Sequence, residues 1–174
     1  LESLLSLLRI PSVRLILLMS VGVFTINHGM GNWLVEIIRS LGESAQRAST
    51  LAAIPVAVGI LSALTLPRLA THARRFSMLI LLFSCSVIAS VLLLTHPDFS
   101  ILIVALIFEG IAAGSMMTVL ILTLVEVPGV GQQRAGTASG FFFSAAEVGG
   151  MGGPLLLGSL LALHGNFDSS LLTL

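Results

Sequence analysis

Three ionisable side chains lie inside long apolar segments of this sequence, where a charge is costly. Glu147 stands in the run GTASGFFFSAAEVGGMGGPLLLG, while Glu109 and His28 stand in two others. An acidic group at the centre of a bilayer costs about 2.5–3.5 kcal/mol on insertion scales, so we expect it to face a bundle interior or a watered cavity. Low dielectric disfavours the charged form of a carboxyl group, which can then exchange a proton near neutral pH. The chemistry expected here is proton exchange, tuned by a neighbouring imidazole.

The three groups are predicted to lie at a similar depth on three different helices, because each is close to the midpoint of its apolar segment. Asn27 and Asn32 add hydrogen-bonding amides on either side of His28, and we expect them to line the same cavity. A structural alternative stays open: a neutral glutamate or a Glu–His pair can hold two helices in register. Glu126 differs, because it stands at the end of its segment, where a solvated or arginine-paired charge is expected.

The composition indicates a membrane protein. Of the 174 residues, 56% are hydrophobic and 9% are charged, whereas soluble domains carry about 25% charged residues. The net charge of zero and the lack of a basic tract argue against a nucleic-acid partner. The single cysteine, Cys85, excludes a disulfide framework and a zinc cluster. No catalytic motif and no nucleotide-binding glycine motif occurs, so we expect neither enzymatic activity nor a cofactor.

Five apolar segments have the length of a membrane-spanning helix, which needs about 20 residues. Short polar connections between them make sequential helices antiparallel neighbours. The expected fold is therefore all-α: one polytopic membrane helix bundle over residues 1–174, with spans at 15–37, 50–70, 76–94, 101–125 and 137–163. The third span has no glycine, no proline and no ionisable group except Cys85, so it is predicted to be peripheral and to face lipid. The other spans carry small residues at four-residue spacing, which predicts close helix packing.

The arginines predict the orientation of the chain in the membrane, since it has eight arginines and no lysine. Two of them, Arg39 and Arg47, fall on one side of the predicted membrane. The other six fall on the opposite side: Arg9, Arg14, Arg68, Arg74, Arg75 and Arg134. The positive-inside rule therefore places the N-terminus of the chain in the cytoplasm. Trp33 lies near the outer end of the first span, where an interfacial indole is favourable.

Three motifs resemble one family of membrane proteins. The stretch HGMGNWLVEIIRSLGESAQRAS, followed by AAIPVAVGILSALTLPRLA, is similar to the seventh and eighth helices of cyanate-type members of the major facilitator superfamily. The loop LPRLATHARR resembles a degraded copy of the family's G-x-x-x-D-R-x-G-R-R loop, in which only Arg74 and Arg75 match. The most specific likeness is the eleventh-helix pattern G-x-x-x-G-P-x-x-x-G, carried by Gly149, Gly153, Pro154 and Gly158.

The chain as a whole resembles the C-terminal half of such a transporter, covering helices seven to eleven and the very start of the twelfth. The chain begins at Leu1 rather than at a methionine and ends as a new apolar run begins. We therefore expect a fragment of a larger protein. The resemblance implies two six-helix bundles that work by alternating access, with a substrate at the midplane between the halves. It implies a bacterial inner membrane (plasma membrane) location, and an absent N-terminal half as partner.

The function implied is secondary active transport of a small organic or inorganic anion such as cyanate, coupled to protons. Glu147 and His28 would belong to the coupling network, and Asn27, Asn32 and Glu109 would line the cavity. No arginine lies at the midplane, so an anion-binding arginine would have to come from the absent half. A non-transporting helical membrane protein, such as a receptor or assembly factor with structural buried charges, is the alternative. An integral-membrane enzyme has the least support, because no reactive grouping is present.

Overall fold

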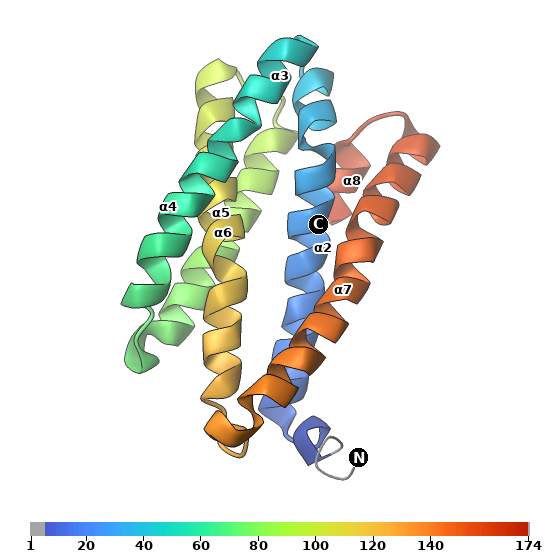
Figure 1. The fold of residues 1–174 in the computed structure, drawn as a ribbon. Helices are drawn as coiled ribbons and strands as arrows, with labels where there is room; N and C mark the ends of the chain where they lie inside the picture. The colour runs from blue at the N-terminus through green and yellow to red at the C-terminus, as the bar shows by residue number, and fades with distance from the viewer. Residues whose placement is uncertain (1–5, 174) are drawn as a thin grey trace.

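A computed structural model describes residues 6–173 as a bundle of helices (Figure 1). No strand occurs within those residues, and five helical segments are long and apolar enough to cross a membrane. The all-α prediction is therefore confirmed. The elements are α2 (Pro11–Ser40), α3 (Ala45–Leu51), α4 (Ala53–Leu69), the 3-10 helix η1 (His72–Arg74), α5 (Arg75–Leu94), α6 (Phe99–Val125), α7 (Gly131–His164) and α8 (Asp168–Thr173).

The helices extend beyond the apolar segments from which they were predicted. Pro11 occupies the first turn of α2, where its missing N–H removes no helical hydrogen bond. At the start of α6 the Asp98 side chain accepts a hydrogen bond from the backbone N–H of Ile101 at 2.9 Å. The 34 residues of α7 correspond to about 50 Å of helix, so its polar first turns project past a hydrocarbon core of about 30 Å. Hydropathy detects only the apolar part of such a helix.

The second predicted span, 50–70, belongs to one membrane-length segment, Ala45–Leu69, in which Ala52 separates two helices. Helix α3 ends at Leu51, Ala52 forms a turn, and α4 begins at Ala53. Pro55 lies in the first turn of α4 and has no N–H, so the carbonyl of Leu51 lacks its usual helical donor. The separation of α3 from α4 therefore follows from the missing backbone donor of Pro55.

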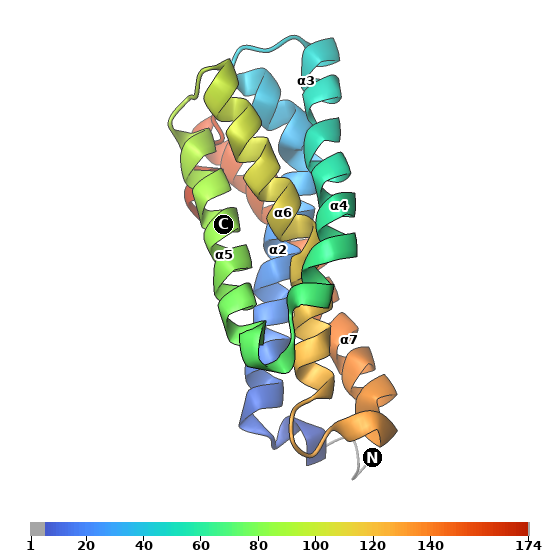
Figure 2. The ribbon, with the colours of Figure 1, turned by 90° about the vertical axis from the view of Figure 1, so that its left-hand side faces the viewer.

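The helices pack as a pair and a group of three, which meet along α6. Helix α2 packs along α7, while α4 and α5 pack against different faces of α6. The two views of Figures 1 and 2 show α2 and α7 side by side, with α4, α5 and α6 beside them. Two apolar clusters hold these groups together, one around Leu120, Leu124 and Phe142, the other around Leu34, Leu102 and Leu106. The short α8 returns against α5 and α7.

Glycines let α2 and α7 touch backbone to backbone. A methyl group built on Gly149 would overlap the carbonyl oxygen of Val21, and one built on Gly153 would overlap that of Thr25. Helices α4 and α6 also touch backbone to backbone, because a methyl group on Gly110 would come 2.7 Å from the Pro55 carbonyl oxygen. The small-residue pattern therefore marks the two tightest helix contacts of the described chain.

Candidate functional site

The Glu147 carboxyl and the His28 imidazole both lie beside Gly150, at the contact between α7 and α2. A Cβ atom built on Gly150 would lie 3.2 Å from Glu147 Oε2 and 3.7 Å from His28 Cε1. The two groups therefore approach the same point from different helices, and the missing side chain of Gly150 leaves that point open. Both side chains are exposed on the isolated chain, and no hydrogen bond joins them within the described residues. We call these two residues the α2–α7 pair.

The His28 ring is held by its own helix. It stacks on Phe24, with ring centroids 5.2 Å apart and planes 18° from parallel. Phe24 is buried, and its side chain also lies next to Gly150. Pro154 has no N–H, so the carbonyl of Gly150 lacks its usual helical donor. A carboxyl group, an imidazole and an under-bonded carbonyl thus lie near one turn of α7, and the first two can each take up or release a proton.

Glu109 lies in a different place, on the wall of a cavity of about 400 Å³ between α2, α4 and α6. Its side chain is 5% exposed. Within residues 6–173 it is the one residue with a buried side-chain oxygen, Oε2, that has no hydrogen-bond partner. Asn27 lines the same cavity from α2. The remaining lining residues are apolar or glycine: Met30, Gly31, Leu34, Ala52, Pro55, Val56, Gly59, Ile60, Ala63, Ala113 and Gly114.

The structure thus arranges the predicted midplane residues as two neighbouring groups. Glu109 and Asn27 share the cavity, whereas Glu147 and His28 form the α2–α7 pair. Asn27 and His28 are consecutive on α2, so this helix joins the two groups. Asn32 lies outside both: it is exposed, and its amide donates a hydrogen bond to the His28 carbonyl at 2.8 Å. A single site that uses all five residues stays a prediction.

Several polar contacts between helices were not predicted, and two of them link the main helix pairs. The Ser62 hydroxyl of α4 lies 2.6 Å from that of Ser115 in α6 and donates to the Ile111 carbonyl at 2.8 Å. The Trp33 indole N–H donates to the Pro154 carbonyl at 3.0 Å, across the α2–α7 contact. Trp33 is therefore a helix–helix link, where the sequence indicated only an interfacial ring. A hydroxyl or indole group in an apolar segment indicates that a hydrogen bond between helices is needed. The sequence does not reveal which group is its partner.

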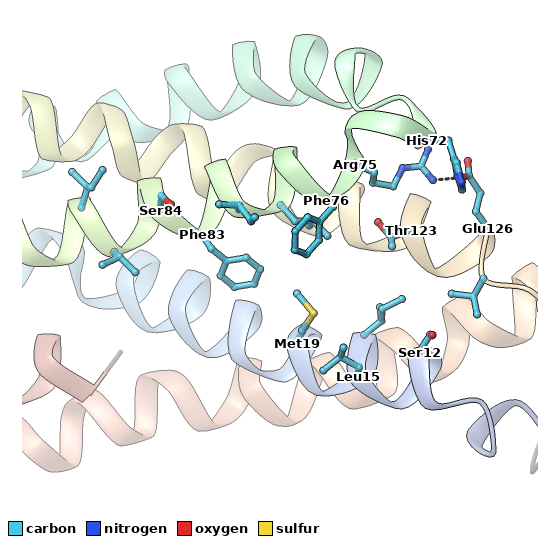
Figure 3. A pocket seen from close by; sticks show the side chains of 16 residues that line it. Ser12, Leu15, Met19, His72, Arg75, Phe76, Phe83, Ser84, Thr123 and Glu126 are labelled. Carbon is cyan, nitrogen blue, oxygen red and sulfur yellow. Dashed lines mark hydrogen bonds and ion pairs between the residues drawn. The ribbon is translucent and has the colours of Figure 1, made fainter.

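An apolar groove of about 930 Å³ lies between α2, α5 and α6. Figure 3 shows Leu15, Met19, Phe76 and Phe83 along it. It shares no residue with the Glu109 cavity. Except at one end, the polar groups on the groove wall are hydroxyl groups. The groove therefore gives a polar solute few binding groups, and it is not the candidate site.

The polar end of this groove is formed by Arg75, one of the two motif arginines, with Glu126 and His72 (Figure 3). Arg75 is buried and makes an ion pair with Glu126, while His72 Nδ1 lies 2.7 Å from Glu126 Oε2. Its guanidinium also donates to the Leu122 carbonyl at 3.0 Å and to the Ala70 carbonyl at 3.3 Å. Arg75 therefore ties the end of α4 to the end of α6, whereas Arg74 is exposed. The expected arginine partner of Glu126 is confirmed.

The Glu126 contacts predict a pH-dependent contribution to stability. Hydrogen bonds from Arg75 and His72 hold the pKa of the Glu126 carboxyl below its usual value. A group whose folded-state pKa is lowered stabilises the fold above its unfolded pKa, about 4.3 for glutamate, and loses that effect as the pH falls through the folded value. We expect Glu126→Gln to lower the melting temperature slightly at neutral pH, and to lower it by less as the pH falls below about 4.3, as measured by thermal melting in detergent.

The control for this prediction is Glu36→Gln, which removes an exposed carboxylate paired with Arg39 at 2.8 Å on α2. An exposed pair within one helix contributes little, so this change should have no comparable effect. A melting difference for Glu126→Gln that is the same at neutral and acidic pH would contradict the ion-pair explanation.

The fold and the site define a multi-pass helical membrane protein that carries polar groups between its helices. The sequence model of the Major Facilitator Superfamily matches residues 1–171. The chain belongs to this superfamily, whose members are membrane transporters and not enzymes. Comparison with curated proteins and with solved structures finds no match.

Proposed function

We propose that the chain is part of a proton-coupled secondary transporter, in which the α2–α7 pair carries the coupling proton. The observation that supports this most is the approach of Glu147 and His28 to one point beside Gly150. Both groups stand within membrane-length helices, where an ionisable side chain is costly and commonly belongs to a proton or substrate path. Alternating access would expose this pair to each side of the membrane in turn.

For the solute we propose a small anion such as cyanate, in keeping with the cyanate-type resemblance. The charge of the α2–α7 pair depends on its protons. A neutral Glu147 beside a protonated His28 carries one positive charge and attracts an anion, whereas a deprotonated pair carries one negative charge and repels it. Binding of the anion would therefore favour the protonated pair. Proton and anion would cross together as symport.

We further propose that the chain forms the C-terminal half of the transporter, with the N-terminus of this segment in the cytoplasm. Several side chains on α7 leave a mixed polar and apolar face uncovered, among them Glu147, Val148 and Met151. A charged group facing hydrocarbon is costly, so an N-terminal six-helix half is the expected cover for this face. The transporter would then lie in the bacterial inner membrane.

The test is uptake by the full-length protein in proteoliposomes, with radiolabelled cyanate, other small anions and nitroimidazoles offered in turn. An inward proton gradient is expected to drive cyanate, or another small anion, above its equilibrium level. Dissipating the proton gradient with a protonophore should abolish accumulation of the solute, while exchange of labelled for unlabelled solute across the membrane continues. If a neutral solute or a cation accumulates and no anion does, the anion assignment is wrong. If no solute moves in either direction, the non-transporting alternative is favoured.

A further inference from the structure

The Glu109 cavity has on its wall a carboxyl group with neither a hydrogen-bond partner nor a counter-charge among the described residues. Glu109 Oε2 is buried and has no hydrogen-bond partner within residues 6–173, and Glu109 is the sole titratable residue on the cavity wall there. Neither an arginine nor a histidine of the described chain lines it. A buried carboxylate without a partner is strongly disfavoured, and a bound positive charge or hydrogen-bond donor offsets that cost.

A second acceptor faces the same space. The Asn27 side chain carries an amide oxygen, and it makes no hydrogen bond within the part of the chain that the structure describes. The break in the second span borders the cavity through Ala52 and Pro55. An acidic oxygen and an amide oxygen on different helices can accept hydrogen bonds from the same ammonium group, which has three donors.

The rest of the wall indicates what is attached to that ammonium group. Met30, Leu34, Val56 and Ile60 supply an apolar surface around the two polar side chains. A volume of about 400 Å³ falls in the range of small-molecule pockets, roughly 300–1,000 Å³. A Ca²⁺ ion takes about six to eight oxygen ligands and a Mg²⁺ ion keeps several of its waters, whereas most of this wall is hydrocarbon and only two of its side chains are polar. The cavity fits an organic body better than a bare ion.

We propose that the cavity between α2, α4 and α6 binds a small organic amine, with its ammonium group on Glu109 and Asn27. The hydrocarbon body lies against Met30, Leu34 and Ile60. This site differs from the α2–α7 pair in residues and in the sign of the charge that it recognises. The inference therefore depends neither on proton coupling nor on the anion proposed above.

The experiment measures thermal stabilisation of the full-length protein in detergent by n-butylammonium. A ligand that binds only the folded state raises the melting temperature in a saturable way. We expect n-butylammonium chloride to do so, and n-butanol and sodium chloride at matched concentrations not to. Equal stabilisation by butanol would show that the cavity does not recognise the ammonium charge, and would overturn the proposal. Stabilisation by sodium chloride without n-butylammonium would assign the cavity to a metal ion and overturn the proposed amine site.

Variants assign the binding to the cavity. Glu109→Gln keeps the shape of the side chain and removes its charge, so the affinity for n-butylammonium should fall about ten- to a hundredfold. Asn27→Ala should weaken binding by a smaller factor, and it keeps the test decisive if Glu109→Gln fails to fold. Glu36→Gln, an exposed change elsewhere on α2, should bind as the unmodified protein does. Unchanged affinity in both Glu109→Gln and Asn27→Ala would overturn the site.

The binding assay and the uptake assay fail independently. Loss of amine binding with intact proton-driven anion uptake would overturn this inference alone. Saturable amine binding without proton-driven uptake would overturn the proposed function alone.

Discussion

Glu147→Gln is expected to abolish uphill accumulation of solute under a pH gradient while exchange across the membrane continues. Glutamine has almost the same shape as glutamate, so the open point beside Gly150 should be preserved. It neither takes up nor releases a proton, so the charge of the α2–α7 pair no longer follows the proton gradient. Accumulation should fall to the equilibrium level. Counterflow in proteoliposomes, with and without an inward proton gradient, separates the two activities.

Two companion variants make this result specific. Glu36→Gln removes an exposed carboxylate near the end of α2, and it should accumulate solute normally. His28→Gln removes the second member of the pair and should shift the pH optimum of uptake. A Glu147→Gln protein that accumulates solute as well as the unmodified one would show that Glu147 is a structural residue. An unchanged pH profile in His28→Gln would reduce that ring to a packing partner of Phe24.

Hydropathy predicted the five spans because apolar length is a property of each segment alone. It did not predict where α3 ends and α4 begins, because Pro55 is compatible both with a kink in one helix and with the first turn of a new one. The polar first turns of α7 were missed for a related reason. Residues from Gly131 onward continue the helix beyond the apolar run, and hydropathy carries no signal for a solvated turn.

The candidate residues could be found by depth, but their grouping could not. Counting along each apolar run placed Glu147, His28 and Glu109 near the same level. Which of them meet depends on the rotation of each helix about its own axis. That rotation is set by contacts between distant segments, such as Gly149 on Val21 and Gly114 on Gly59. The depth of a residue in the membrane therefore follows from its own segment's sequence. Which neighbouring helix its side chain faces is known only from the packed bundle.

The glycine contacts between α2 and α7 lead to the prediction with the largest effect on folding. Alanine at Gly149 or Gly153 would push a methyl group onto a backbone carbonyl oxygen of α2. Backbone atoms cannot move aside as a flexible side chain can, so the two helices must separate. Overpacking of this kind costs about 1–3 kcal/mol and sometimes more. We expect each alanine variant to lower the melting temperature clearly, and the double variant to yield little folded protein.

Gly152 provides the matched control, because it lies on the same helix between the two contact glycines and a methyl group there meets no atom within 4 Å. Gly152→Ala adds the same methyl group and improves helix propensity, so its melting temperature should be unchanged or raised. Because the three substitutions are chemically identical, a difference among them reports the contact with α2 and nothing else about glycine. If Gly149→Ala and Gly153→Ala melt like Gly152→Ala, the two helices do not pack as closely as described. The α2–α7 pair would then lack the fixed geometry that the proposed proton coupling requires, since Glu147 and His28 both lie beside Gly150 only while α2 and α7 stay in contact.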